Sequence, residues 1–486
     1  MARKQLVVVV VVLGALSLIT ILALAGVVFF SLSQLQQAAQ PEPLPTYTPS
    51  ITPIPTWTPT PIPTLSLPPT VAPTSPPTAT PTPPFTSLQD VGALDQIELE
   101  VAALRGLEPL RPVPRWAITR QELRTYYVEP VLDEHWEEQL DSLTLTLAAF
   151  DLMEPGLDLA PVLKSFLPEI IAGFYDPQTG GIYIVSDTGE IGAYEQLVFA
   201  HEYGHALQDQ HFDLLALGFD EFGFTFDDLD RFNAIRALVE GDAELIESQY
   251  LGALPRVDEV ACAPLARAFG FGQTAFKPRP VAPGLQQPPV EDVFLFPYSY
   301  GKVFVQTLYG RGGWEAVNAA YADLPQSTEQ ILHPARYLAG DAPVPVSVAP
   351  LADTLGGDWR LVFEDPIGEL VLRIYLQNYL TAEEAAKAAE GWGGDLGVVY
   401  YDDASGELVM VLHSVWDTQY EAGEFLGAYV TYAARRYGHP ASDATGGLSC
   451  WYGDDTLCVN WSGDKVTVLL GPDWQTVDRL IPIVSE

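Results

Sequence analysis

The chain has 486 residues, enough for two or three domains, and its 63 acidic residues against 24 basic ones give a net charge of −39. This charge excludes a nucleic-acid-binding protein and argues against binding to an anionic membrane surface. None of the three cysteines has zinc-site spacing, and they fit an extracytoplasmic location, where Cys450 and Cys458 flank an expected turn closely enough for a disulfide.

The N-terminus indicates a membrane anchor. Residues 1–5 include Arg3 and Lys4, and residues 6–30 form an unbroken apolar run. A run of about 25 residues can cross a bilayer once. By the positive-inside rule, residues 1–5 are cytoplasmic and the remainder of the chain is extracytoplasmic. We therefore expect a single-pass signal anchor in the cell membrane; cleavage near residue 39 is the alternative.

A stalk and a helical segment are expected next. Residues 31–88 are rich in proline and threonine, cannot build a core, and favour a disordered, extended spacer. Residues 89–164 contain an amphipathic helical pattern at 91–107 and a second helical stretch at 133–150. We expect this segment to pack on the domain that follows, and an inhibitory pro-segment is the alternative.

The next domain, residues 165–347, carries an H-E-x-x-H motif formed by His201, Glu202 and His205. It begins with an expected β-hairpin, followed by a helix over 193–212 that contains the motif. Two histidines four residues apart share one helix face, so they can bind one metal ion, and zinc suits two nitrogens plus a carboxylate. Glu202 can take a proton from a water molecule that attacks a carbonyl. The motif indicates a zinc-dependent hydrolase.

Two residues compete for the role of third zinc ligand. His211 lies six residues after His205, as in metzincins, but Gln208 stands where that motif has a glycine, and no methionine follows closely. Glu240 lies in a second expected helix, residues 230–251, which can pack across the first helix and bring the carboxylate to the metal. We favour Glu240.

This pattern resembles the gluzincin superfamily of zinc metallopeptidases, in which a glutamate on a following helix, often within an E-G-x-A string, completes the zinc site. Here the string starting at Glu240 reads E-G-D-A. The resemblance covers about residues 165–340 and implies a zincin-like catalytic domain with zinc as its cofactor. Glu244, one turn after Glu240, is the candidate for a hydrogen bond to a zinc-bound histidine, and Asp242 is its rival.

A second match concerns the stabilisation of the reaction intermediate. Residues 297–302 open an apolar helix that ends near 310–314, and they resemble the Y-x-x-G helix that follows the third ligand in gluzincins of the aminopeptidase type. The resemblance assigns the oxyanion hydrogen bond to Tyr298, with Tyr300 and His333 as alternatives. The G-x-M-x-N motif of exopeptidases is missing, so aminopeptidase activity is not implied.

Residues 348–486 are expected to form a C-terminal α+β domain that serves in binding or packing. The expected elements are a helix at 381–390, a hairpin at 398–401 and 408–412, a helix capped by Asp417 that ends near 436, and strands at 451–461 and 466–470. Residues 391–395 read as a tight turn.

The whole sequence therefore predicts an α+β protein with a membrane anchor, a stalk, a zincin-like domain and a C-terminal domain. We expect an extracytoplasmic zinc-dependent peptidase that acts on a peptide or protein substrate and does not bind nucleic acid. Two alternatives are a catalytically silent, stalked binding protein on a zincin scaffold, and a structural adhesin whose motif is accidental. The intact Glu202 favours the enzyme, because a silent site has no need of a base.

Overall fold

A computed structural model describes residues 85–89, 91–133, 137–153, 156, 159–219, 228–253, 291–445 and 447–484. The expected anchor at 6–30, most of the expected stalk and Cys262 lie outside these residues. Within the described part of the chain, no helix is both long enough and apolar enough to cross a membrane.

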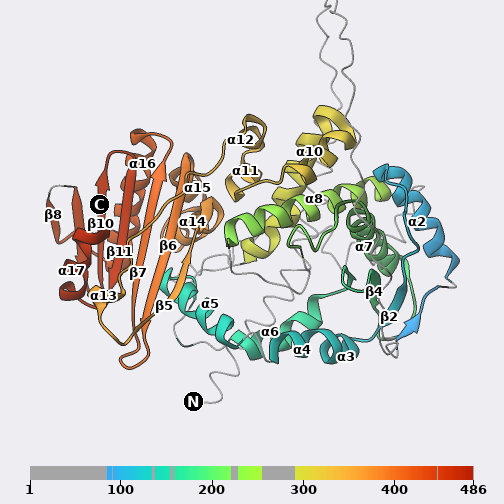
Figure 1. Cartoon of the computed structure of the whole chain (residues 1–486), viewed down its shortest axis with the longest axis horizontal. Helices are drawn as coiled ribbons and strands as arrows, with labels where there is room; N and C mark the ends of the chain where they lie inside the picture. Colours follow the sequence, from blue (N-terminus) through green and yellow to red (C-terminus); the bar gives the residue numbers. More distant parts are fainter. Residues whose placement is uncertain are drawn as a thin grey trace, which may run out of the picture.

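The fold is mixed α+β, as expected, and its strands form two separate sheets (Figure 1). A small sheet lies beside the long helices that carry the motif residues. A larger sheet occupies the opposite end of the molecule, with short helices between the two. The site expected from the sequence therefore lies in the half of the molecule that contains the small sheet.

The small sheet has four strands in the order β1-β2-β4-β3: β1 is Thr86–Ser87, β2 is Arg115–Ile118, β3 is Gly173–Asp176 and β4 is Gly181–Val185. The β3–β4 pair is the expected hairpin, and β2 pairs with β4 in parallel. Because β1 pairs with β2, the folded part includes residues from the end of the range assigned to the stalk. The segment 89–164 thus supplies a strand to the interior of this sheet.

Helices connect these strands. They are α2 (Gly92–Arg105), α3 (Arg120–Leu123), a π-helical turn (Arg124–Val128), α4 (Glu129–Asp133), α5 (Glu137–Ala149) and α6 (Leu159–Ile170). On α2, Leu94, Ile97 and Val101 recur at helical spacing and are buried in one cluster with Phe199 and Tyr203. That packing fixes the side of the motif helix that faces away from the site.

Three long helices build the site: α7 (Ala193–Phe212), α8 (Leu229–Ala253) and α10 (Glu291–Ala322). From the sequence, α10 was expected to begin within residues 297–302. It begins earlier, at Glu291, and Pro297 lies inside the helix. Its regular helix is interrupted at Gly312 and Gly313, at the expected end, and a second helical stretch continues from there to Ala322.

The helices α8 and α10 cross with their backbones in direct contact at Gly241 and Gly301. A Cβ added to Gly301 would lie 2.1 Å from the Ala237 carbonyl oxygen, and one added to Gly241 would lie 2.2 Å from the Gly301 carbonyl. Only glycine permits this approach. The glycines of the E-G string and of the Y-x-x-G string therefore have the same purpose, which is to let the two helices meet.

The larger sheet belongs to the C-terminal half. Its seven strands pair antiparallel in the order β5-β6-β7-β11-β10-β9-β8; they are β5 (Trp359–Asp365), β6 (Trp392–Asp402), β7 (Glu407–Trp416), β8 (Asp443–Thr445), β9 (Leu448–Tyr452), β10 (Thr456–Ser462) and β11 (Lys465–Gly471). The associated helices are α11 (Thr328–Leu332), α12 (Pro334–Ala339), α13 (Ala352–Leu355), α14 (Gly368–Leu376), α15 (Ala382–Ala389), α16 (Gln419–Tyr437) and α17 (Trp474–Val484).

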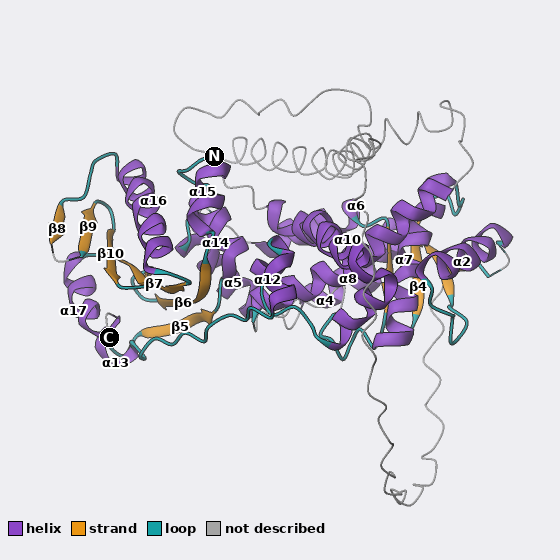
Figure 2. Ribbon diagram, turned by 90° about the horizontal axis from the view of Figure 1, so that it is seen from above, coloured by secondary structure: helices purple, strands orange, loops and turns teal. Residues whose placement is uncertain are grey.

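Helices lie on both faces of this sheet (Figure 2), and each face belongs to a cluster of buried residues. On β7, Met410 and Leu412 belong to the cluster beneath α14, α15 and α16, whereas Val409 and Val411 belong to the cluster beneath α17. This alternation follows from the two-residue period of a strand. The helix α17 was missed by the sequence analysis.

Two local expectations in this half were wrong, and the expected disulfide is present. Residues 391–395 do not form only a turn, because β6 begins at Trp392 and the buried Asp395 accepts hydrogen bonds from the Ile367 amide and the Trp392 indole, both at 2.8 Å. The N-cap of α16 is Thr418 and not the expected Asp417; the Thr418 hydroxyl accepts a hydrogen bond from the Glu421 amide. The Cys450–Cys458 disulfide joins β9 to β10.

Residues of the C-terminal half also fix the N-terminal end of α8 in place. The Leu229 amide donates to Asp365 Oδ2 at 2.7 Å, so a residue of β5 caps this helix. Asp230 accepts from the Thr328 amide at 3.1 Å, and a Cβ at Gly368 would lie only 1.8 Å from Asp230 Oδ1. The helix that carries Glu240 is therefore anchored by both halves of the molecule.

Candidate metal centre

The helix α7 has a buried side and a side that faces the candidate centre. Its first turn is closed by Glu195, which accepts from the Gly192 amide at 2.9 Å, and it ends where Asp213 adopts a left-handed conformation. Phe199 and Tyr203 pack in the core below it. The helical period then directs His201 and His205 together towards α8.

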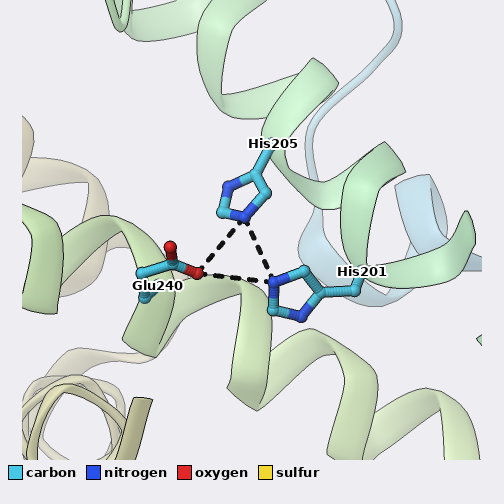
Figure 3. A group of neighbouring side chains, drawn as sticks. All are labelled: His201, His205 and Glu240. Carbon is cyan, nitrogen blue, oxygen red and sulfur yellow. Dashed lines mark hydrogen bonds and ion pairs between the residues drawn. The ribbon is translucent and has the colours of Figure 1, made fainter. Parts of the chain in front are cut away.

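The structure brings His201, His205 and Glu240 together (Figure 3). The two Nε2 atoms are 3.2 Å apart, and each lies 3.4 Å from Glu240 Oε2. A tetrahedral zinc ion with bonds of about 2.0–2.1 Å holds its ligand atoms roughly 3.3 Å from one another. The three ligand atoms therefore have the separations that one such ion requires.

Burial supports the same conclusion. Glu240 and His205 are buried, and the only partners of Glu240 Oε2 among the described residues are the two histidine Nε2 atoms, both at the long distance of 3.4 Å. A carboxylate oxygen held in the interior by such long contacts alone is poorly stabilised. A cation bound at the centre of the triangle would satisfy it.

The electrostatics of the centre also call for positive charge. Burial acts to raise the pKa of Glu240, but the hydrogen bonds and charges of His201 and His205 hold that pKa well below its usual range. Burial acts to lower the pKa of His201, yet Glu240 and Glu247 raise it well above the ordinary value. The cluster thus stabilises a cation, whether a proton or a metal ion, between these side chains.

Each histidine is oriented by a contact at its other ring nitrogen. His201 Nδ1 lies 3.2 Å from Glu247 Oε2, and His205 Nδ1 lies 2.8 Å from Gln208 Oε1. A proton on Nδ1 that is donated to these oxygens leaves Nε2 free to bind a metal. These partners keep both Nε2 atoms directed at the centre.

From the sequence, Glu244 or Asp242 is expected to orient a zinc-bound histidine. Glu244 lies within 4.8 Å of His201 but forms no hydrogen bond or ion pair with it; its carboxylate is instead 3.6 Å from Lys302 Nζ, and burial raises the pKa of this carboxyl to about 7. Asp242 points away from the centre and accepts from Arg105 Nε at 2.8 Å and from the Tyr321 hydroxyl. The predictions of Glu244 and of its rival Asp242 were therefore wrong, and Glu247, which had not been considered, contacts His201 instead.

A sequence signal for the correct partners existed. Glu247 lies seven residues after Glu240 and therefore on the same face of α8, two turns further on. Gln208 lies three residues after His205 and so beside it on α7. Gln208 had been considered only as the residue that breaks the metzincin pattern.

Glu202 lies beside the centre in a buried position. Its Oε2 atom has no hydrogen-bond partner among the described residues. Burial raises the pKa of Glu202, and the charges of His201 and His205 and a hydrogen bond from the Tyr175 backbone amide partly offset this effect. Tyr175 belongs to β3, the edge strand of the small sheet, so this edge lies next to Glu202.

The candidates for the oxyanion hydrogen bond lie in different places. The Tyr298 ring lies beside His201, with 6.5 Å between the two ring centroids. Tyr300 has 45% of its surface exposed, so it points outwards. His333 is remote from the centre and contacts Glu369 at 3.1 Å. Of the three, the structure brings Tyr298 to the candidate centre.

The competing third ligand is elsewhere. His211 Nε2 contacts the Glu108 carbonyl oxygen at 2.8 Å on the exposed end of α7. The groups of possible metal ligands within the described residues do not include it.

Comparisons with known proteins bear on the C-terminal half alone. A family model described as a domain of unknown function (DUF8575) matches residues 359–481, which run from β5 into α17. No curated protein and no solved structure matches the chain.

Proposed function

We propose that this protein is a zinc-dependent peptidase of the gluzincin type, with His201, His205 and Glu240 as metal ligands. The observation that carries the proposal is the triangle of ligand atoms with edges of 3.2, 3.4 and 3.4 Å. The order of hairpin, H-E-x-x-H helix, glutamate helix and tyrosine helix supports a zincin-like fold for this half.

The proposed chemistry divides among a few side chains. When bound, zinc supplies a Lewis acid that makes water nucleophilic near neutral pH. Glu202 takes the proton of the attacking water and passes it to the departing amine, and the raised pKa that burial gives its carboxyl suits this exchange. Tyr298 donates a hydrogen bond to the oxygen on which negative charge develops, a contact typically worth about 3 kcal/mol.

The small sheet provides a surface for the substrate backbone. Strand β3 is an edge strand, and the Tyr175 amide contacts Glu202. An extended peptide can add to such an edge through main-chain hydrogen bonds. We include in the proposal the N-terminal membrane anchor and stalk, which would hold this site outside the cell and give it access to peptides or proteins there.

Metal analysis of the full chain tests the proposal. We expect about one zinc ion per chain, with strong loss of zinc in Glu240→Ala. The matched control is His211→Ala, the alternative ligand, which should keep its zinc. Zinc retained in Glu240→Ala and lost in His211→Ala would contradict the ligand assignment, and zinc absent from the wild type would favour a binding protein.

Cleavage of a peptide library then tests the reaction. Glu202→Gln should bind zinc like the wild type and lose cleavage by roughly 100- to 10,000-fold, because the substitution removes the proton acceptor and leaves the three metal ligands in place. If Glu202→Gln cleaves at the wild-type rate, the assignment of the base is wrong.

A further inference from the structure

Arg236 lies on the face of α8 that carries the metal ligand. It precedes Glu240 by one turn, and its Nη2 atom is 3.8 Å from Glu240 Oε1, the oxygen that does not face the histidines. This separation is too long for a hydrogen bond. Only 17% of the arginine side chain is exposed, and its other contact is with the Phe232 ring. Arg236 therefore places a cation at the rim of the candidate centre.

The guanidinium of Arg236 makes no hydrogen bond to any described residue, which sets it apart from other arginines buried to the same extent. Those arginines each donate to a carboxylate, in the pairs Arg105–Asp242, Arg115–Glu98, Arg373–Glu369 and Arg436–Asp151. The one ion pair of Arg236 among the described residues is the 3.8 Å contact with Glu240, which leaves its N–H donors without a hydrogen-bond acceptor there. Arg236 thus has free donors in the arrangement that suits a carboxylate.

Among the described residues, the other two carboxylates further along α8 do not supply such an acceptor. Glu244 is paired with Lys302, and Glu247 contacts His201. Both lie beyond Glu240 on the opposite side from Arg236 along α8. The free donors of Arg236 are therefore available to a group that enters the centre from solution.

We propose that Arg236 binds a carboxylate of the substrate, close to the bond that is cleaved. This inference rests on the proposed function and names its substrate class, peptides that present a negative charge at this position. Arg236 precedes Glu240 by about 6 Å along the helix axis, which is the length of about two extended residues. The carboxylate therefore lies within about two residues of the scissile bond, either as the α-carboxylate of the substrate or as an acidic side chain.

Equilibrium binding tests this inference without turnover. The full chain carries Glu202→Gln, and the probes are three libraries of randomised hexapeptides. The first lacks acidic residues and ends in a free carboxylate, the second lacks them and ends in an amide, and the third ends in an amide but contains Asp and Glu. We expect the first or the third to bind roughly 10- to 100-fold more tightly than the second, the range for hydrogen bonds between charged groups.

Variants at position 236 identify the residue responsible. Arg236→Gln should abolish the preference for a carboxylate, and Arg236→Lys should retain part of it, because a lysine keeps the charge without the paired donors. Arg231→Gln, at an exposed position on the same helix, should behave like the wild type. Zinc content measured on each variant shows that the ligand triangle is intact.

The outcomes separate this inference from the proposed function. Equal binding of all three libraries, or a preference that survives Arg236→Gln, would overturn the role of Arg236 even if wild-type protein cleaves peptides. A preference for carboxylates that Arg236→Gln removes, in a chain that cleaves none of the peptides, would support the binding role and contradict the peptidase. If the first library is preferred, products shortened by one or two C-terminal residues are expected from wild-type protein.

Discussion

Adding a methyl group at Gly301 should force α8 and α10 apart. In the structure, the Cβ of a Gly301→Ala variant would lie 2.1 Å from the Ala237 carbonyl oxygen, and contacts below 3.0 Å are not seen for real Cβ atoms. Because the opposing atom belongs to the backbone of α8, no side-chain rotation relieves the clash. The helices must separate by about 1 Å or bend.

The magnitude follows from two opposing effects. Replacing glycine by alanine inside a helix stabilises it by about 1 kcal/mol. Overpacking of a tight contact costs about 1–3 kcal/mol, and a clash between two backbones belongs at the upper end. We therefore expect Gly301→Ala to lose about 2 kcal/mol. Gly310→Ala lies in the same helix, where an added Cβ would meet no atom within 4 Å, so it should gain about 1 kcal/mol.

Urea unfolding followed by tryptophan fluorescence measures the difference between these two variants, which should be about 3 kcal/mol from the sum of the loss and the gain. Zinc content gives a second readout, because Glu240 precedes Gly241 at the crossing and should shift in Gly301→Ala only. If Gly301→Ala is as stable as Gly310→Ala and binds zinc equally well, the close crossing is not what holds the two helices in place.

Two further predictions concern groups around the centre and at the junction of the two halves. Glu247→Gln should weaken zinc binding by roughly 10-fold, because it removes the carboxylate that orients His201. Glu244→Gln is the control and should have a smaller effect. Competition with a chelator measures zinc affinity in both variants, and equal effects would contradict the role of Glu247. Burial raises the pKa of Asp230 to about 8. The folded state therefore holds the proton of the Asp230 carboxyl more tightly than the unfolded state does, where the pKa is about 4. The free energy of unfolding of the wild type consequently falls as the pH rises from about 4 towards 8. Asp230→Asn should therefore gain stability relative to the wild type across this range, as judged from urea midpoints at several pH values; a constant difference would show that Asp230 is not buried in this way.

Local patterns were enough to predict the elements that carry the candidate site. The expected helix over 193–212 coincides with α7, and the expected helix over 230–251 lies within α8. The hairpin before them was also predicted, because alternation and turn residues act over a few neighbours. The sequence also showed the spacing of the H-E-x-x-H motif, and it indicated Glu240 on a following helix.

The sequence by itself determined which residue types can reach one face of one helix, since a spacing of three, four or seven residues has the same meaning in every α-helix. It did not determine how two helices are rotated against each other. The rotation of α8 against α7, where Gly204 packs on Ala243 and Ile246, decides that Glu247 and not Glu244 reaches His201. Only the tertiary structure decided this, because the contacts join residues that are far apart in the chain.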